Sequence, residues 1–336
     1  YVVLFQLRIG GQSARNRDET WPHAVHCIGQ ETTGPGGFAK ALRTVPVVLE
    51  AAELVRRHAK PDAWIIDFTN PVGIVTRALL DAGHRAVGLC NAAIGFQRTF
   101  ARLLGVEPHR IELRHFGLNH LTWEREALLD GADVLPALLR DYGEKFSNDM
   151  GLPLHILRAL GQLPSYYLRY YYSHDRVLEE QLAEPTRAEA VMAVERELLG
   201  LYADPSVTTK PEALSRRGGA CYSEAAIDLM ASLATDRGDV QVVNLRNDGT
   251  LPFLPDDHVI EVAARIDATG VRALPVEPVP DDQRGLISAV AGYERLALDA
   301  AINGGRDRAL RAMQAHPLVL QYDRAEKLTD LLLANN

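Results

Sequence analysis

A cysteine and a histidine, Cys90 and His120, are the residues of this sequence best suited to hold a transition metal. Each comes at the end of an apolar segment, 86–89 and 115–118 respectively. Thiolate sulfur and imidazole nitrogen are both ligands of borderline divalent metals. Two protein ligands leave coordination positions open, where substrate hydroxyls could bind a Lewis-acidic metal. The residue types alone leave two interpretations open, a metal site or a buried thiol beside a core histidine.

Other polar side chains follow apolar segments in the same way. Thr69 and Asn70 come after 63–68, and Asn91 comes directly after Cys90. Arg15 lies in a polar stretch that is either a solvated helical turn or a site for phosphate or carboxylate, which suit a guanidinium fork.

Two further residues occupy the ends of expected elements in the second half of the chain. Tyr222 follows the pair Gly218-Gly219, so it is expected at the N-terminus of a helix over 223–235, after a flexible turn. Arg246 follows an expected strand over 240–245.

The elements that must position these residues alternate in type. Apolar runs at 63–68, 85–90 and 110–116 predict strands, and the segments 74–82 and 94–104 between them predict helices. This alternation with short loops is typical of an α/β fold with a Rossmann-like, doubly wound parallel sheet. In such sheets, ligands bind beyond the carboxyl ends of the strands.

The pattern changes after residue 120. Asp130-Gly131 predicts a hairpin turn, and helical stretches follow. We expect two domains, residues 1–120 as the dinucleotide-binding part and residues 121–336 as an α+β catalytic and substrate domain. Five tyrosines lie within 165–172, where they either pack at an aromatic helix face or subunit interface, or stack on a sugar.

Composition limits the classes of partner. The 336 residues carry a formal net charge of −8, which argues against nucleic acid but allows an anionic substrate at a local arginine cluster. Three cysteines are too few for a disulfide framework and indicate a reducing, cytoplasmic location. No apolar run reaches membrane-spanning length, so we expect no membrane partner. The tyrosine segment and long C-terminal helices favour a homo-oligomer, a dimer or tetramer.

Six short motifs together resemble glycoside hydrolase family 4 over nearly the whole chain. In order they are Gly29-Gln30-Glu31-Thr32-Thr33-Gly34, Thr69-Asn70-Pro71, Gly88-Leu89-Cys90-Asn91, Phe116-Gly117-Leu118-Asn119-His120, Arg217-Gly218-Gly219-Ala220-x-Tyr222-Ser223 and His316-Pro317-Leu318-Val319. The sequence looks most like the 6-phospho-β-glucosidase branch, where Asn follows the cysteine as Asn91 does here.

The resemblance implies a fold like that of lactate and malate dehydrogenases, and hydrolysis by redox chemistry. NAD⁺ takes hydride from C3 of a 6-phospho-β-glucoside, a tyrosine removes the acidified C2 proton, the aglycone leaves from C1, and water and hydride are then added back. By position, the family's metal ligands are Cys90 and His120, with Mn²⁺ the expected metal, and its base is Tyr222.

The resemblance also suggests residues that bind the other two ligands. Asn70 and Asn91 match substrate contacts, and Thr69 with Asn70 is expected to contact the cofactor. Arg15 and Arg246 are candidates for the sugar or its phosphate.

Two departures from the family pattern keep alternatives open. No Gly-rich nucleotide turn precedes Tyr1, so we expect that the sequence is clipped or that the sheet lacks its first strands. Ala93 stands where this branch usually has proline. The alternatives are the same chemistry on a 6-phospho-galactoside or unphosphorylated glycoside, a non-catalytic truncated paralogue, and a 2-hydroxy-acid dehydrogenase with a His-Asp relay.

Overall fold

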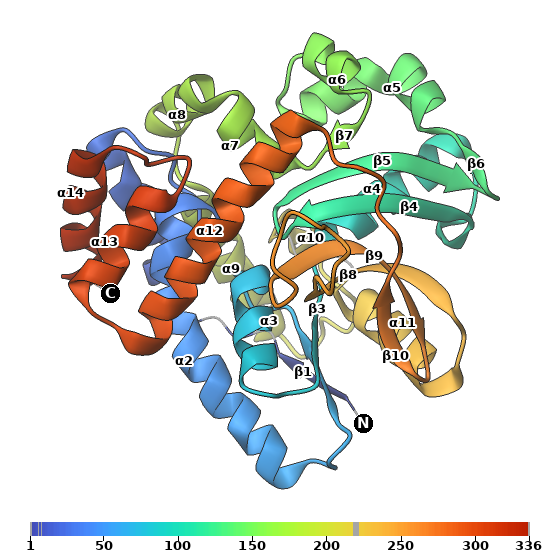
Figure 1. The fold of residues 1–336 in the computed structure, drawn as a ribbon, viewed down its shortest axis with the longest axis horizontal. Coiled ribbons are helices and arrows are strands. Elements are labelled where there is room, and N and C mark those ends of the chain that lie inside the picture. The colour runs from blue at the N-terminus through green and yellow to red at the C-terminus, as the bar shows by residue number, and fades with distance from the viewer. Residues whose placement is uncertain (1, 6, 8, 218–221, 335–336) are drawn as a thin grey trace.

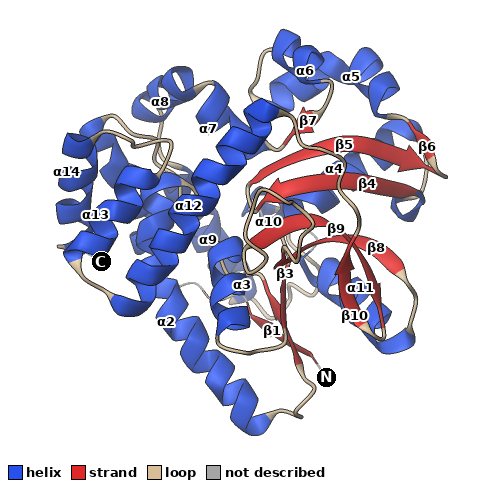
Figure 2. Ribbon diagram, in the orientation of Figure 1, coloured by secondary structure: helices blue, strands red, loops and turns tan. Residues whose placement is uncertain are grey.

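A six-stranded sheet forms the centre of the computed structural model, which describes residues 2–5, 7, 9–217 and 222–334 (Figure 1, Figure 2). Its strand order is β1-β2-β3-β8-β9-β10. The strands are β1 (Val2–Phe5), β2 (Trp64–Asp67), β3 (Ala86–Gly88), β8 (Asp239–Arg246), β9 (Val259–Asp267) and β10 (Gly270–Ala273). β1, β2 and β3 are parallel, whereas β8 runs antiparallel to β3.

Helices cover both faces of this sheet, as the α/β prediction requires. The helices are α1 (Gly11–Thr20), α2 (Gly34–His58), α3 (Val72–Asp81), α4 (Asn91–Leu104), α5 (Leu135–Met150), α6 (Leu154–Leu160), α7 (Arg169–Tyr172), α8 (His174–Ala183), α9 (Arg187–Tyr202), α10 (Ala213–Arg217), α11 (Tyr222–Thr235), α12 (Asp281–Asn303), α13 (Arg306–Ala315) and α14 (Tyr322–Leu333).

Side chains along each strand point alternately to the two faces of the sheet, and different helices pack on each face. Ile65 packs in the core formed with α2, α3 and α12, whereas its neighbour Ile66 packs with α11 on the opposite face. Successive strand side chains point to opposite faces, so a continuous apolar run indicates a strand buried on both sides. The predicted α/β fold is therefore confirmed.

The third strand of the predicted parallel series lies elsewhere. β4 (Ile111–Leu118) does not join β2 and β3, but pairs antiparallel with β5 (Leu121–Leu129) in a second sheet. That sheet is completed by β6 (Ala132–Asp133) and β7 (Leu163–Pro164), and it packs on α4 and α5. The assignment of 110–116 to the parallel sheet was wrong because an apolar run indicates a strand but not its partner.

Two hairpin turns end this second sheet. Asp130 and Gly131 both have positive φ, 50° and 89°, which confirms the predicted Asp-Gly turn. At the other end, Asn119 and His120 join β4 to β5. The domain boundary near residue 120 remains a prediction, and β8–β10 from the C-terminal part complete the sheet of β1–β3.

The tyrosine segment does not form one aromatic helix face. Residues Tyr166–Leu168 make a 3-10 turn, and α7 that follows has only one helical turn. Tyr166, Tyr167 and Tyr170 nevertheless contact one another, with ring centroids 5.9 to 6.2 Å apart. Tyr170 is buried, whereas Tyr166 and Tyr172 are partly exposed.

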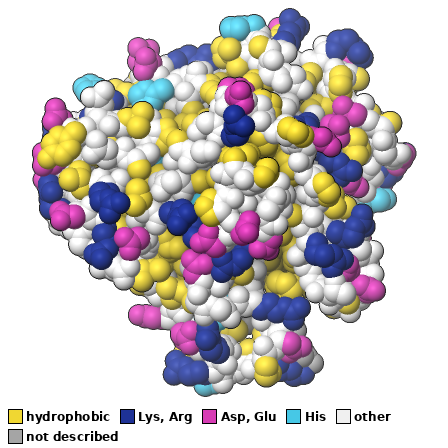
Figure 3. Space-filling model, viewed as in Figure 1, with side chains coloured by type: hydrophobic (Ala, Val, Ile, Leu, Met, Phe, Trp, Pro, Cys, Tyr) yellow, Lys and Arg dark blue, Asp and Glu magenta, His cyan; other side chains and the backbone are white. Residues whose placement is uncertain are grey.

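Acidic and basic side chains are interspersed over the face of the molecule seen in Figure 3. Among the described residues, every helix is too short or too polar to cross a membrane.

Candidate active site

His120 lies in the two-residue turn between β4 and β5, with a positive φ of 65°. Its ring stacks on Tyr167, with centroids 3.9 Å apart and planes inclined by 24°. Burial lowers the pKa of the imidazole to about 4. His120 is therefore neutral at physiological pH, the form that binds metals. Its Nδ1 is buried without a hydrogen-bond partner.

Cys90 lies just past the end of β3 and caps the N-terminus of α4. Burial, and then the charge of Glu261, raise the pKa of its thiol to about 12, while polar groups of Ala92, Asn119 and Asn91 act in the opposite direction. Asn119 directly precedes His120 in the turn, so the thiol and the imidazole both lie near this residue.

A buried polar network underlies this pair. His115 lies 2.6 Å from Glu124 through Nδ1 and 3.1 Å from Glu261 through Nε2. Burial favours the neutral ring, but the two carboxylates outweigh it and raise the pKa of His115 to about 10. Glu261 also accepts hydrogen bonds from Asn119 at 2.6 Å and Asn244 at 2.9 Å. We refer to these five residues as the glutamate network.

The carboxyl end of β2 provides the residues predicted for the cofactor. The hydroxyl of Thr69 accepts a hydrogen bond from the backbone N–H of Leu7, which links the ends of β1 and β2. Its own N–H donates to Asp67. The side-chain oxygen of Asn70 is buried without a partner. An unpaired buried acceptor is costly, so Asn70 suits contact with a bound polar group.

Tyr222 begins α11, as predicted, and its ring packs against Phe68 with centroids 4.8 Å apart. The preceding glycines, and Cys221, lie outside the described residues. Burial, followed by interactions with Cys90, Tyr170 and Tyr222, raises the pKa of Tyr167 well above its ordinary value. Tyr167 thus lies within electrostatic range of both the thiol and Tyr222, while its ring covers His120.

Arg15 lines a cavity of about 540 Å³ next to this cluster, together with Tyr167, Tyr170 and Arg169. The guanidinium pairs with Glu19 at 2.8 Å and with Glu31 at 3.3 Å. Arg15 is thus held at the wall of a cavity that reaches the tyrosine on His120. Asn91, the first residue of α4, directly follows Cys90.

Arg246 is not brought to this site. It pairs with Asp81 at the C-terminal end of α3, whereas Asn70 lies next to the N-terminal end of that helix. β8 runs antiparallel to β3 and pairs at Gly88 with Asn244, which places Arg246 beyond the end of β3 opposite to Cys90. The prediction that Arg246 contacts substrate is therefore not supported by its position.

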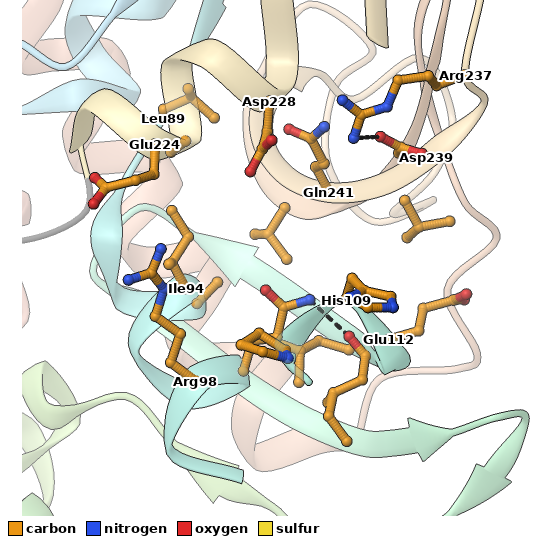
Figure 4. A pocket seen from close by; sticks show the side chains of 18 residues that line it. Leu89, Ile94, Arg98, His109, Glu112, Glu224, Asp228, Arg237, Asp239 and Gln241 are labelled. Carbon is orange, nitrogen blue, oxygen red and sulfur yellow. Dashed lines mark hydrogen bonds and ion pairs between the residues drawn. The ribbon is translucent and has the colours of Figure 1, made fainter. Parts of the chain in front are cut away.

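A second cavity, of about 410 Å³, lies between α4 and α11 and contains none of the predicted site residues (Figure 4). Apolar side chains such as Leu89 and Ile94 line it, and charged residues surround its mouth, where Arg237 pairs with Asp239.

Two motifs from opposite ends of the chain meet beside the site. The backbone nitrogen of Gly34 lies 3.2 Å from Nε2 of His316, whose ring is buried against Tyr293. His316, with Asn119, His120 and other side chains, lines a cavity of about 20 Å³, large enough for one water molecule.

The donor set fits a divalent metal bound by two protein ligands. Within residues 2–5, 7, 9–217 and 222–334, no group of three or more His, Cys, Asp or Glu side chains could hold a metal. Cys90 and His120 nevertheless both lie near Asn119. The imidazole of His120 is neutral, and its Nδ1 has no partner. Such a pair leaves positions open for substrate.

Sequence reasoning missed the glutamate network and the role of Tyr167. The signal for Glu261 was a carboxylate among the apolar residues 259–264 of β9. Buried carboxylates require partners, so this position could have been singled out.

Comparison with known proteins identifies the family. The model of the "Family 4 glycosyl hydrolase" matches residues 1–106, and that of its C-terminal domain matches residues 115–319. This chain belongs to glycoside hydrolase family 4. It is 40% identical, over 98% of its length and 78% of the relative, to a Bacillus subtilis (strain 168) protein named "Probable 6-phospho-beta-glucosidase".

A Thermotoga maritima 6-phospho-beta-glucosidase, BglT, is 35% identical over 99% of this chain and 80% of the relative. A structure of the 6-phospho-beta-glucosidase from Thermotoga maritima, with manganese, NAD⁺ and glucose-6-phosphate, superposes with a TM-score of 0.91 at 33% identity. That match covers all of this chain and 80% of the other. The predicted family resemblance is confirmed.

Proposed function

We propose that this protein hydrolyses 6-phospho-β-glucosides with the help of NAD and a divalent metal, Mn²⁺ being the expected ion. The observation that carries the proposal is the buried imidazole of His120, whose Nδ1 has no partner, in a chain whose relatives are named 6-phospho-beta-glucosidases. When bound, NAD supplies a hydride acceptor and the metal supplies a Lewis acid for the sugar oxygens.

Tyr222 acts as the base that takes the C2 proton, next to a carbonyl at C3. It lies at the N-terminus of α11, where the helix dipole favours a negatively charged phenolate. The ring of Tyr167 covers one face of the His120 imidazole and keeps water from it. In this proposal the proton-accepting residue, Tyr222, is distinct from the metal-holding pair, Cys90 and His120.

Asn70, Thr69, Asn91 and Arg15 bind and orient the ligands. The unpartnered oxygen of Asn70 accepts a hydrogen bond from the substrate or cofactor, and Thr69 lines the cofactor side at the end of β2. Arg15 is the residue of the adjoining cavity that recognises the sugar phosphate, since a guanidinium can bind phosphate through two hydrogen bonds. We expect Arg15→Gln to raise KM for a phosphorylated substrate more than it lowers kcat.

The test combines an assay with a base variant. Protein is incubated with NAD⁺, Mn²⁺, a reducing agent and p-nitrophenyl-6-phospho-β-glucoside, and nitrophenol release is followed. We expect release from the parent and a loss of roughly 10²–10⁴-fold in Tyr222→Phe, the usual range for a general base. Tyr202→Phe, at an exposed position on α9, is the matched control. No release from the folded full-length parent would refute the proposed function.

Exchange of the C2 proton separates the base from the other steps. The parent is expected to exchange C2 deuterium with solvent, and Tyr222→Phe is expected to lose this exchange. If the variant exchanges as fast as the parent, another residue is the base.

We propose further that the protein acts in the cytoplasm as a homo-oligomer. Large apolar side chains are exposed on α9, among them Leu199 and Tyr202, at 69% and 54%. Light scattering coupled to size-exclusion chromatography tests this, and a mass of one chain at micromolar concentration would contradict it.

A further inference from the structure

We propose that Glu261 is a positioning residue. It fixes Asn119, and so the turn that carries His120, relative to Cys90. The inference rests on the proposed function, because it concerns the metal pair of that site. Glu261 itself lies behind the pair, among buried side chains, and is 1% exposed.

Three donors from three separate elements converge on this one carboxylate. Oε1 accepts from His115 of β4 at 3.1 Å. Oε2 accepts from Asn119 in the turn at 2.6 Å and from Asn244 of β8 at 2.9 Å. A carboxylate only accepts hydrogen bonds and can take several, so it satisfies all three donors at once. A glutamine in its place would turn an NH₂ group toward at least one of them.

The same side chains reach both metal ligands. Asn119, which directly precedes His120 in the turn, also lies near enough to Cys90 to influence the pKa of its thiol. Asn244 also reaches back to the backbone oxygen of Gly88, two residues before Cys90, at 3.4 Å. Through these two amides, the carboxylate of Glu261 fixes the end of β3 relative to the β4–β5 turn.

The close approach of the strands at this point supports the arrangement. A Cβ atom added to Gly88 would lie 2.2 Å from the hydroxyl of Thr76 and 2.9 Å from Cβ of Asn244. The absence of a side chain at Gly88 thus lets β8 carry Asn244 directly against the strand of Cys90. The distance between the two ligands is set by packing and by Glu261 together.

The experiment measures Mn²⁺ binding directly, without NAD, substrate or turnover. Free Mn²⁺ is followed by electron paramagnetic resonance as metal-free full-length protein is titrated. We expect Glu261→Gln to weaken Mn²⁺ binding by roughly 10–100-fold, as for other residues that orient metal ligands, with an unchanged circular dichroism spectrum. The control is Glu126→Gln on β5, in the hairpin that carries His120, where the carboxylate is 43% exposed and its replacement should leave binding as in the parent.

A second variant keeps the proposal testable if Glu261→Gln does not fold. Asn119→Ala removes the hydrogen bond between the carboxylate and the β4–β5 turn, leaves those from His115 and Asn244 in place, and should weaken Mn²⁺ binding by roughly tenfold or more. In the double variant the two effects should not add, because both remove one connection. Parent-like binding by Asn119→Ala, or additive effects, would overturn the inference while leaving the proposed function intact. A parent protein that binds no Mn²⁺ would overturn both.

Discussion

The two histidines of the β4–β5 hairpin have opposite surroundings. Both ring nitrogens of His115, in the glutamate network, face a carboxylate. His120 keeps its buried Nδ1 without a partner, as Asn70 does its side-chain oxygen. The network also holds unpartnered acceptor atoms, on Glu124 and Asn244, so the contrast lies in the pairing of the two imidazole rings. Both rings are buried, at 2% and 6% exposed, so access to water does not explain it.

This difference separates residues that support the site from residues that bind ligands. A buried group that is paired within the protein gains little from a ligand, whereas an unpaired one regains a lost hydrogen bond or coordinate bond on binding. Pairing thus distinguishes a histidine such as His115 from one such as His120, although they lie five positions apart on one hairpin.

The largest expected effect breaks the paired side. His115→Gln leaves Glu124 and Glu261 as two buried carboxylates without a cation, and we expect a loss of roughly 3–5 kcal/mol in the free energy of unfolding. Chemical denaturation of the variant and parent measures it. His109→Gln, at an exposed position, should change the midpoint little. A His115→Gln protein as stable as the parent would show that the network is not charge-paired.

A smaller loss is expected on the unpaired side. His120→Ala removes one of two metal ligands and should weaken Mn²⁺ binding by about 100-fold or more, about 2.7 kcal/mol, while the unfolding midpoint of the metal-free protein changes little. Titration of metal-free protein measures the first quantity and denaturation the second. Equal Mn²⁺ binding by variant and parent would remove His120 from the site.

Asp67 gives a pH-dependent test of burial without an ionic partner. Burial raises the pKa of its carboxyl to about 7, against hydrogen bonds from Thr69 that lower it. The pKa of Asp67 is higher in the folded protein than in the unfolded chain, so the protonated carboxyl stabilises the fold at a pH below the unfolded pKa. This stabilisation is lost as the pH rises toward about 7. Asp67→Asn should therefore gain stability relative to the parent over this interval, by about 1.4 kcal/mol per pKa unit at most.

Denaturation at about pH 4 and about pH 8 checks this, without added ligands. A difference between variant and parent that stays constant with pH would mean that Asp67 is ionised in the fold at both values.

The smallest effect concerns Arg246, which lies outside both regions. Its ion pair with Asp81 is partly exposed, so Arg246→Gln should cost at most about 1 kcal/mol. Its kcat/KM should stay close to that of the parent. A selective rise in KM for a phosphorylated substrate would instead restore the sequence-based assignment of Arg246 to the substrate.

Local elements were the most predictable part of the fold. The expected segments 63–68, 74–82, 85–90 and 94–104 correspond to β2, α3, β3 and α4 within a few residues. Asn303-Gly304-Gly305 and Pro317 lie where α12, α13 and α14 are separated from one another. These features depend on neighbours in sequence, such as periodicity, glycine and proline, and so can be inferred from one chain.

Strand partners and the glutamate network depend on distant residues. β4 was assigned to the wrong sheet because its turn, Asn119-His120, lacks the Asn-Gly or Asp-Gly signature of a tight hairpin. His115 contacts both Glu124 and Glu261, and Glu261 lies 146 positions after it in the sequence. Motif matching brought Cys90 and His120 forward, but only the fold could show what supports them.

The contact between Tyr167 and His120 gives the site a built-in optical reporter. The two rings stack with their centroids 3.9 Å apart, and the tyrosine is partly buried. A cation bound at the imidazole would withdraw electron density from that ring and change the polarity around the phenol beside it. The ultraviolet absorption of Tyr167 would then change when a metal binds at His120. The Tyr167→Phe variant, which lacks this signal, is the control.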